Sequence, residues 1–400
     1  MNLRFGVLSL ATVLFAAGCA GPERKLTPLV SEPTPRPAPI VEVQETPSTS
    51  TPAPIVTAPE PTATPTPAPV RPPVEVKSEP KPVVVEHPVE VKVLPPPVIT
   101  NLVSLQEWCK EHSLPLPQIT REPAQTNIVI RSDNGVFAYE PPRRNARWNG
   151  ILLGVAAPPV FTNHQTLVSA IDLNKVLLPL LITNDAPRKR GGIVVIDPGH
   201  GGSNEVALSH DRKSKEKLFT LDWARRVEKL LEGSAWKVVL TRTNDADISL
   251  TNRVALAETN KADLFISLHF NSFTKPGESG LETYCMTPQG MVSHVTRTFA
   301  DDVKEAVPNN EFDVDNFLLA YDMQRAMLRK TGRTDRGIRR ARFMTVLRDQ
   351  KRPAVLLEGG YLSNPEEGKL IATAEYRQKL AEAVAEALGV KPPTLTTLRK

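Results

Sequence analysis

Three apolar segments in the C-terminal half of the chain each end in side chains that could bind a metal ion or carry a proton. IVVID is followed by PGHGG with His200, LFISL is followed by His269, and AVLL is followed by Glu358. Imidazole and carboxylate groups serve both purposes in proteins, and glycines let a ligand approach the backbone. A single histidine or glutamate at a strand end is an ordinary structural residue. Two histidines and a carboxylate at three such ends favour a functional site.

The segments around these residues predict the elements that position them. Strands are expected at 192–197, 236–242, 264–270, 281–286, 343–347 and 354–360, and helices at 218–233, 250–260, 316–332 and 365–388. Apolar strands separated by amphipathic helices indicate an α/β domain with a mostly parallel, twisted sheet flanked by helices. Ligands bind such sheets beyond the carboxyl ends of the strands, so the polar residues after the strands matter most.

These residues belong to longer motifs that resemble the zinc-dependent N-acetylmuramoyl-L-alanine amidases of bacterial cell walls. The resemblance covers residues 192–388 and rests on VVIDPGHGG, KEK at 215–217, TRTNDADISLTNRVALAETNKADLFISLHFNS, DRGIRRARFMTVL and PAVLLEGGYLSN. It implies that His200, Glu216 and His269 bind Zn²⁺ and that Glu358 is the catalytic carboxylate. Two imidazoles and one carboxylate leave a fourth position for water, which is typical of catalytic zinc sites. The metal would activate the water, and the carboxylate would pass its proton to the leaving amine.

The chain departs from the family pattern in two places. After GHGG the family usually continues with Asp-Pro-Gly, whereas this chain has SNE at 203–205. Glu205 and His210 therefore remain alternatives to Glu216 as the third ligand. Glu216 is favoured because it opens the helix at the family's ligand position, whereas His210 lies in a charged loop. The family's Glu-Thr-Gly is here Glu358-Gly359-Gly360, which leaves the carboxylate in place.

Further residues could contact the substrate. Asn271, two residues beyond a predicted ligand, could orient the site or the substrate, or simply belong to a turn. Residues 324–352 are rich in arginine, and Arg336 or Arg339 could bind carboxylates of the peptidoglycan stem peptide, since guanidinium groups suit carboxylates. The alternative is a solvated basic face. The net charge of +5 on 400 residues is too small to indicate nucleic-acid binding.

Residues 287–316 form an unusually long connection between a strand and a helix. Such insertions beside strand ends often form lids or binding loops. One interpretation is a surface excursion that frames the substrate groove. The other follows from the resemblance, since some relatives carry a helix here that blocks the zinc until an activator protein displaces it. Asp301, Asp302 and Glu305 could then supply the blocking carboxylate.

The N-terminal part predicts export and attachment to a membrane. Residues 1–18 have the basic start, short apolar stretch and small-residue end of a signal peptide, and AAGC resembles a lipobox that would lipidate Cys19. The alternative is an ordinary cleaved signal peptide followed by an incidental cysteine. Residues 19–98 predict a disordered linker, because 21 of the 39 prolines lie between Pro28 and Pro97. We expect a periplasmic lipoprotein at the outer membrane. The three cysteines are too widely spaced for a disulfide scaffold.

Residues 99–187 predict a small α+β accessory domain. A short helix is expected at 102–114, with strands at 126–131 and 135–141 and hairpin turns at NG and NH. The segment 148–181 resembles the stalk domain of copper amine oxidases. The catalytic domain would follow at 188–390, with a tail at 391–400. The leading hypothesis is an enzyme that cleaves peptidoglycan between N-acetylmuramic acid and L-alanine. The alternatives are a zinc peptidase acting within the stem peptide and an inactive peptidoglycan-binding scaffold.

Overall fold

The computed structural model describes residues 101–122, 125–162, 164–182, 191–203, 215–274, 277–295 and 302–390. The predicted signal peptide, Cys19, the linker, Glu205, His210 and the tail lie outside these ranges. Within them, no helix has both the length and the hydropathy that crossing a bilayer requires.

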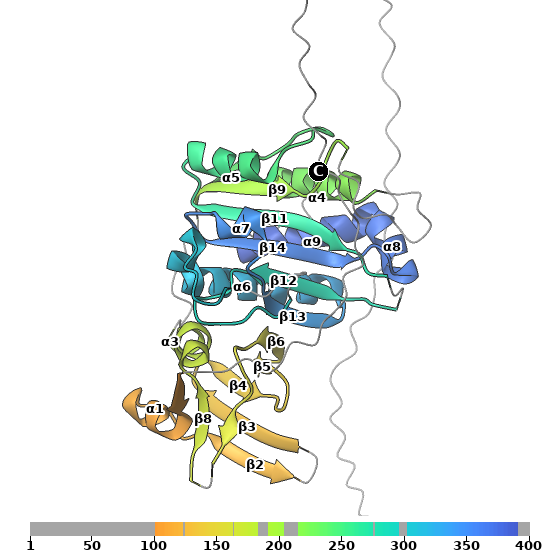
Figure 1. Cartoon of the computed structure of the whole chain (residues 1–400). Helices are drawn as coiled ribbons and strands as arrows, with labels where there is room; N and C mark the ends of the chain where they lie inside the picture. Colours follow the sequence, from red (N-terminus) through yellow and green to blue (C-terminus); the bar gives the residue numbers. More distant parts are fainter. Residues whose placement is uncertain are drawn as a thin grey trace, which may run out of the picture. The chain divides into compact units, whose positions relative to one another are not determined.

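The C-terminal half is built on a twisted sheet between two layers of helices (Figure 1). The strands run in the order β10-β9-β11-β14-β12-β13, and the first four are parallel. β12 is antiparallel to β14, and β13 is parallel to β12. The predicted α/β fold is therefore confirmed. The strand bounds are β9 (Gly192–Pro198), β10 (Trp236–Leu240), β11 (Leu264–Asn271), β12 (Leu281–Cys285), β13 (Asp335–Arg340) and β14 (Ala354–Tyr361).

Alternate residues of the buried strands enter two separate cores, one on each face of the sheet. Val194 and Ile196 of β9 belong to the larger core with α4, α6 and α9, whereas Val195 packs in the smaller core with α5 and α7. This alternation is the period of two that a strand imposes on its side chains. The helix bounds are α4 (Glu216–Leu231), α5 (Leu250–Thr259), α6 (Asp313–Thr331), α7 (Thr345–Arg348), α8 (Pro365–Ala372) and α9 (Ala374–Ala387), with a 3-10 turn at Pro308–Phe312.

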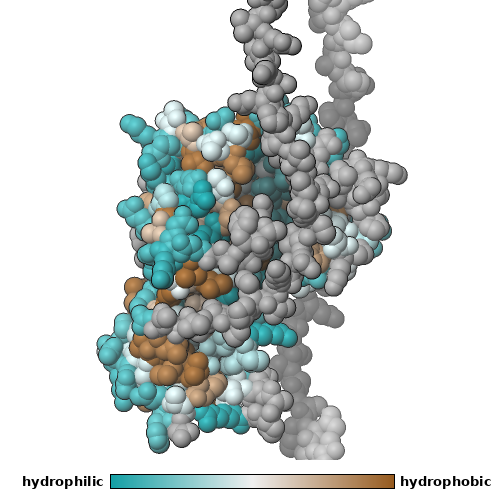
Figure 2. Space-filling model, viewed as in Figure 1, coloured by the Kyte–Doolittle hydropathy of each residue, from teal (hydrophilic) through white to brown (hydrophobic). Residues whose placement is uncertain are grey.

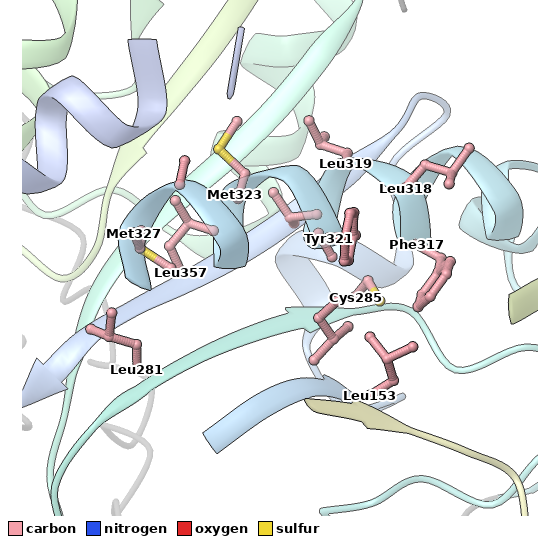
Figure 3. Packing of buried hydrophobic residues seen from close by; sticks show 14 of the residues in the cluster. Leu153, Leu281, Cys285, Phe317, Leu318, Leu319, Tyr321, Met323, Met327 and Leu357 are labelled. Carbon is pink, nitrogen blue, oxygen red and sulfur yellow. The ribbon is translucent and has the colours of Figure 1, made fainter. Parts of the chain in front are cut away.

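The larger core continues from the C-terminal half into the N-terminal module. Figure 3 shows side chains of α6, including Phe317, beside Cys285 of β12, with Leu153 of the N-terminal module close by. All of these side chains are buried, and they belong to one hydrophobic cluster. Burial of apolar surface therefore stabilises the two parts together.

The N-terminal module adds antiparallel strands to the same sheet. β2 to β6 pair in sequence order, and β6 then pairs in parallel with β13, which makes a sheet of 11 strands. The predicted hairpin at NG is confirmed, because Asn149 and Gly150 have φ of 48° and 86° between β5 and β6. The bounds are β1 (Leu102–Ser104), α1 (Leu105–Glu111), β2 (Gln118–Glu122), β3 (Gln125–Ser132), β4 (Gly135–Tyr139), β5 (Asn145–Trp148), β6 (Ile151–Gly154), β7 (Val160–Phe161), β8 (Thr166–Ser169), α2 (Ala170–Asp172), a π-helical turn at Leu173–Leu177 and α3 (Leu178–Ile182).

Polar contacts also join the module to the C-terminal half. The Arg144 guanidinium donates to the carbonyl oxygens of Val292 and Ser293, at 2.6 and 3.2 Å. Asp335 Oδ2 accepts from the backbone N–H of Leu152 at 2.7 Å. On the face shown in Figure 2, apolar surface forms separate patches between hydrophilic residues. Large apolar side chains that are exposed include Val160 and Leu116.

Two predicted elements are wrong. The strand expected at 343–347 is absent; the chain forms the short helix α7 there, with Val346 and Leu347 in the smaller core. The sheet instead contains the strand β13, which the sequence did not predict because its arginines interrupt the apolar pattern. The helix expected at 365–388 is two helices. Thr373 has extended backbone angles, and its hydroxyl accepts from Tyr376 N, so it ends α8 and caps α9.

The connection at 287–316 also differs from expectation. Because β12 runs antiparallel to β14, its carboxyl end lies at the edge of the sheet where β14 begins. The described residues of the connection 287–316 lie at this edge of the sheet. Asn309 Nδ2 donates to the carbonyl oxygens of Gln350 and Arg352, and the Arg342 guanidinium donates to those of Pro288 and Glu305. These residues neither frame nor cover the strand ends that carry His269 and Glu358; Asp301 and part of the expected helix lie outside the described ranges.

Candidate metal centre

His200, Glu216 and His269 converge beyond the carboxyl ends of β9 and β11. His200 follows β9, His269 lies near the end of β11, and Glu216 is the first residue of α4. Glu216 Oε2 lies 3.1 Å from His200 Nε2, and Glu216 Oε1 lies 3.0 Å from His269 Nδ1. One ligand atom from each residue can be chosen so that all lie within 4.8 Å of one another. The structure thus brings together the three residues predicted as ligands.

Glu216 is buried, and its carboxylate is held in place by the backbone as well as by the histidines. The Phe270 N–H donates to Oε1 at 2.9 Å. Burial alone would raise the pKa of Glu216, but the hydrogen bonds and charges of His200 and His269 outweigh it and bring the pKa to about 2. The carboxylate is therefore ionised and suited to a cation.

The glycines of the PGHGG loop allow the histidines to approach each other. A Cβ at Gly199 would lie 2.3 Å from Cε1 of His269, so a side chain there would displace the imidazole. Gly201 has φ of +135°, and a Cβ would lie 2.1 Å from the Ala246 carbonyl oxygen. His200 itself has φ of 60°, an uncommon conformation outside glycine. The conformation of this loop therefore determines where the imidazole rings of His200 and His269 lie. Their centroids are 4.9 Å apart.

Three buried cations hold this loop against its neighbours. The Arg242 guanidinium donates to the carbonyl oxygens of Pro198, Gly199 and Lys217. Arg253 donates to the His200 carbonyl oxygen at 2.7 Å and forms an ion pair with the Asp197 carboxylate at 2.6 Å. Lys217 Nζ donates to the Gly202 carbonyl oxygen at 2.6 Å and to the Asp245 carboxylate at 2.7 Å. Sequence reasoning missed Arg242 and Arg253, although each lies in the TRTNDADISLTNRVALAETN motif.

Glu358 lies beside the three-residue cluster. It pairs in register with His269 on the neighbouring parallel strand. Burial raises the pKa of Glu358 well above its usual value, and the charges of Glu216 and Glu282 add to this effect. Within the described part of the chain, its buried Oε2 atom has no hydrogen-bond partner.

The arrangement fits a metal with one open coordination position. Two imidazole nitrogens and a buried carboxylate oxygen form a borderline-soft donor set that suits zinc. The orphaned Glu358 Oε2 beside them would have a partner if a metal-associated water lay between. Among the described residues, this is the one group of three or more His, Cys, Asp or Glu side chains close enough to share an ion.

A residue that sequence reasoning missed, Glu282 at the start of β12, connects the predicted substrate contacts. It is buried and pairs in register with Glu358. Its carboxylate accepts from Asn271 Nδ2 at 3.2 Å, and it forms ion pairs with Arg336 and Arg339, each at 3.0 Å. The structure therefore brings Asn271, Arg336 and Arg339 to one carboxylate beside Glu358. The only available signal was the glutamate in GLETY.

Known proteins match the catalytic half of the chain. The family model described as N-acetylmuramoyl-L-alanine amidase matches residues 194–389. The amidase AmiA of Escherichia coli (strain K12) is 32% identical over 224 residues, which cover 50% of this chain and 77% of AmiA. The amidase AmiC of Neisseria meningitidis serogroup B is 30% identical over 219 residues, covering 50% of this chain and 52% of AmiC.

A solved structure matches half of the chain. The catalytic domain of CwlV, an N-acetylmuramoyl-L-alanine amidase from Bacillus (Paenibacillus) polymyxa var. colistinus, is 34% identical. The match covers 50% of this chain and 99% of that domain, with a TM-score of 0.41. The family model, the sequence identity to AmiA and the share of AmiA that is covered lead to one conclusion. The chain belongs to the N-acetylmuramoyl-L-alanine amidase family, whose members hydrolyse the amide bond between N-acetylmuramic acid and L-alanine in peptidoglycan.

Proposed function

We propose that this chain is a zinc-dependent peptidoglycan amidase with His200, Glu216 and His269 as metal ligands and Glu358 as the general base and acid. The observation that carries the proposal is the convergence of the three ligand atoms within 4.8 Å, next to a buried carboxylate oxygen without a partner. Zn²⁺ bound there would polarise the scissile carbonyl and lower the pKa of water.

The protein's own groups would perform the remaining steps. In the proposed mechanism, Glu358 Oε2 would accept the proton of the attacking water and then donate it to the nitrogen of the departing L-alanine. Burial raises the pKa of Glu358, which makes its carboxylate a stronger base toward the proton of the water. Arg253 and Phe270 would keep two ligands in place through the His200 carbonyl oxygen and Glu216 Oε1.

The deciding experiment is metal analysis of the purified protein, combined with mass spectrometry of muropeptides that it has digested. Release of intact stem peptides with a free L-alanine amine, at a zinc content near one per chain, supports the proposal. Cleavage only within the stem peptide would indicate the alternative zinc peptidase. Binding to wall sacculi without any product would indicate an inactive scaffold.

We also propose that lipidation of Cys19 attaches the enzyme to the outer membrane, with residues 19–98 as a spacer reaching into the wall. The support is the small-residue approach to Cys19 and the proline-rich composition behind it. Several acyl chains together hold a protein at a membrane surface. Cys19→Ala should move the protein from the membrane fraction to the soluble periplasmic fraction. Unchanged partitioning of the variant between the two fractions would contradict the membrane tether. That the activity of the enzyme depends on an activator protein remains a prediction.

A further inference from the structure

Glu282 occupies a position in the sheet that relates it directly to the candidate site. His269 of β11, Glu358 of β14 and Glu282 of β12 form one register row across three neighbouring strands. Side chains directly opposite each other on neighbouring strands lie on the same face, with Cβ atoms about 5 Å apart. Glu282 is 2% exposed, so its charge lies at the inner wall of the site and must be compensated there.

Hydroxyl and amide donors satisfy part of the Glu282 carboxylate. Tyr284 donates to Oε2 at 2.7 Å, and Asn271 Nδ2 donates to the same oxygen at 3.2 Å. Tyr361 donates to Oε1 at 3.3 Å. These contacts fix the orientation of the carboxylate from three different strands, so its remaining charge faces the two arginines.

The two arginines that pair with Glu282 differ in what else they contact. Arg336 donates to Glu282 through Nε, pairs with Glu278 through Nη1 at 2.7 Å, and lies over the Tyr361 ring at 4.9 Å. Arg339 approaches Glu282 Oε1 through Nε at 3.0 Å. In the described residues, no hydrogen bond or further ion pair occupies Nη1 or Nη2 of Arg339, and its side chain is 31% exposed.

We propose that Arg339 binds a free carboxylate of the stem peptide and that Glu282 is the positioning residue that aims it, an inference that rests on the proposed amidase function. The Arg339 guanidinium is ion-paired with Glu282 at Nε, without a hydrogen bond to that atom, and its two terminal nitrogens form a fork that suits a second carboxylate. The residue after L-alanine lies within about 7 Å of the scissile bond, because one residue spans at most about 3.6 Å. A carboxylate on that residue can therefore reach a group anchored next to Glu358.

The same geometry gives Arg336 a structural role. Its Nε and Nη1 atoms are engaged by Glu282 and Glu278, and Tyr361 covers one face of its guanidinium. Of the two arginines predicted from the sequence, the structure therefore favours Arg339 for substrate recognition. The enzyme would distinguish an acidic stem peptide from one in which this carboxylate is a carboxamide.

The test compares two muramoyl peptides that differ only in a free carboxylate or a carboxamide on the residue after L-alanine. We expect the full-length enzyme to prefer the carboxylate form, and Arg339→Gln to raise KM for that form by about tenfold, as expected for one charge-assisted hydrogen bond. KM for the carboxamide form and both kcat values should change little. Glu282→Gln should reduce the same preference through KM while leaving the zinc content unchanged.

Arg329→Gln is the matched control. Arg329 forms an ion pair with Glu386 between α6 and α9, on the face of the sheet opposite to Glu282 and Arg339. This variant should retain the full preference. Equal KM values for the two peptides in the parent enzyme, or an unchanged preference in Arg339→Gln, would overturn the inference.

Binding separates this inference from the amidase function itself. Calorimetric titration of zinc-loaded Glu358→Gln with each peptide measures the preference without turnover. If the parent protein cleaves neither peptide but Glu358→Gln binds the carboxylate form more tightly, the proposed function fails and the carboxylate site stands. Equal binding of both peptides overturns the carboxylate site whatever the activity.

Discussion

The imidazole of His294 occupies the space that a side chain at Gly154 would need. A Cβ at Gly154 would lie 2.3 Å from His294 Cε1. The ring is fixed at both nitrogens, since Nε2 lies 2.9 Å from Val155 O and Nδ1 accepts from Arg340 N at 3.0 Å. This contact lies where β6 of the N-terminal module joins β13 of the catalytic half. The module is therefore packed as part of the enzyme's own sheet.

We expect Gly154→Ala to destabilise this junction by about 1–3 kcal/mol, the usual cost of overpacking a well-packed interior. His294 cannot move without losing a hydrogen bond to a buried backbone group. Urea unfolding of the full chain measures the change. Gly277→Ala is the control, because no atom lies within 4 Å of a Cβ placed there. If both variants unfold at the parental urea concentration, the junction is looser than these contacts indicate.

Substitutions of the proposed metal ligands and of Glu358 should have different effects on zinc content and on hydrolysis. His200→Ala or His269→Ala should remove bound zinc, because two protein ligands hold a catalytic zinc poorly. Glu358→Ala should retain zinc but lose hydrolysis, since the proposed mechanism uses this carboxylate to move the proton and not to hold the metal. Zinc content per chain and turnover of a soluble muropeptide are the measurements. Near-normal turnover in Glu358→Ala would show that another group carries the proton.

Long motifs made the centre of the site predictable from the sequence. Apolar strands ending in histidine or glutamate place His200, His269 and Glu358 at one edge of a parallel sheet, and the structure places them there. The strand β13 was hidden because its alternation includes arginine: Arg340 is fully buried, over the Phe317 ring. Hydropathy patterns cannot identify a buried cation of this kind.

The role of Glu282 and the location of 287–316 depend on strand direction, which the sequence does not specify. An apolar strand such as LETYC could run either way in the sheet. Because β12 is antiparallel to β14, its first residues lie at the site and its last residues lie at the far edge. This reversal brings Glu282 next to Glu358 and takes the long connection away from it.

Asp172 should make the protein less stable as the pH rises from about 4 to 7. It is fully buried; Oδ1 accepts from Ala156 N, and within the described residues Oδ2 has no partner. Burial raises the pKa of Asp172 to about 7 from an unfolded value of 3.8, although nearby N–H groups and Arg144 oppose the shift. Between these values the folded state binds more protons than the unfolded state, so the free energy of unfolding falls with rising pH.

Asp172→Asn isolates this effect, because asparagine keeps an acceptor for Ala156 N and does not ionise. Its advantage over the parent should be absent near pH 4 and grow to at most about 4 kcal/mol above pH 7. Urea unfolding of both proteins at several pH values provides the comparison. A difference that stays constant with pH would show that Asp172 titrates at its ordinary value.

Excision of Gln289–Val307 tests whether the long connection regulates the enzyme. The described parts of this segment supply Met291 O and Glu305 O as acceptors for the Arg342 guanidinium, at 3.3 and 2.8 Å, and Val307 is buried in the smaller core. Removing them leaves buried donors unsatisfied, which costs about 1–3 kcal/mol for each group. We therefore expect a less stable protein that retains zinc and shows equal or lower activity on purified wall sacculi. An increase in activity on sacculi would show that residues within the segment reach the metal centre and block it.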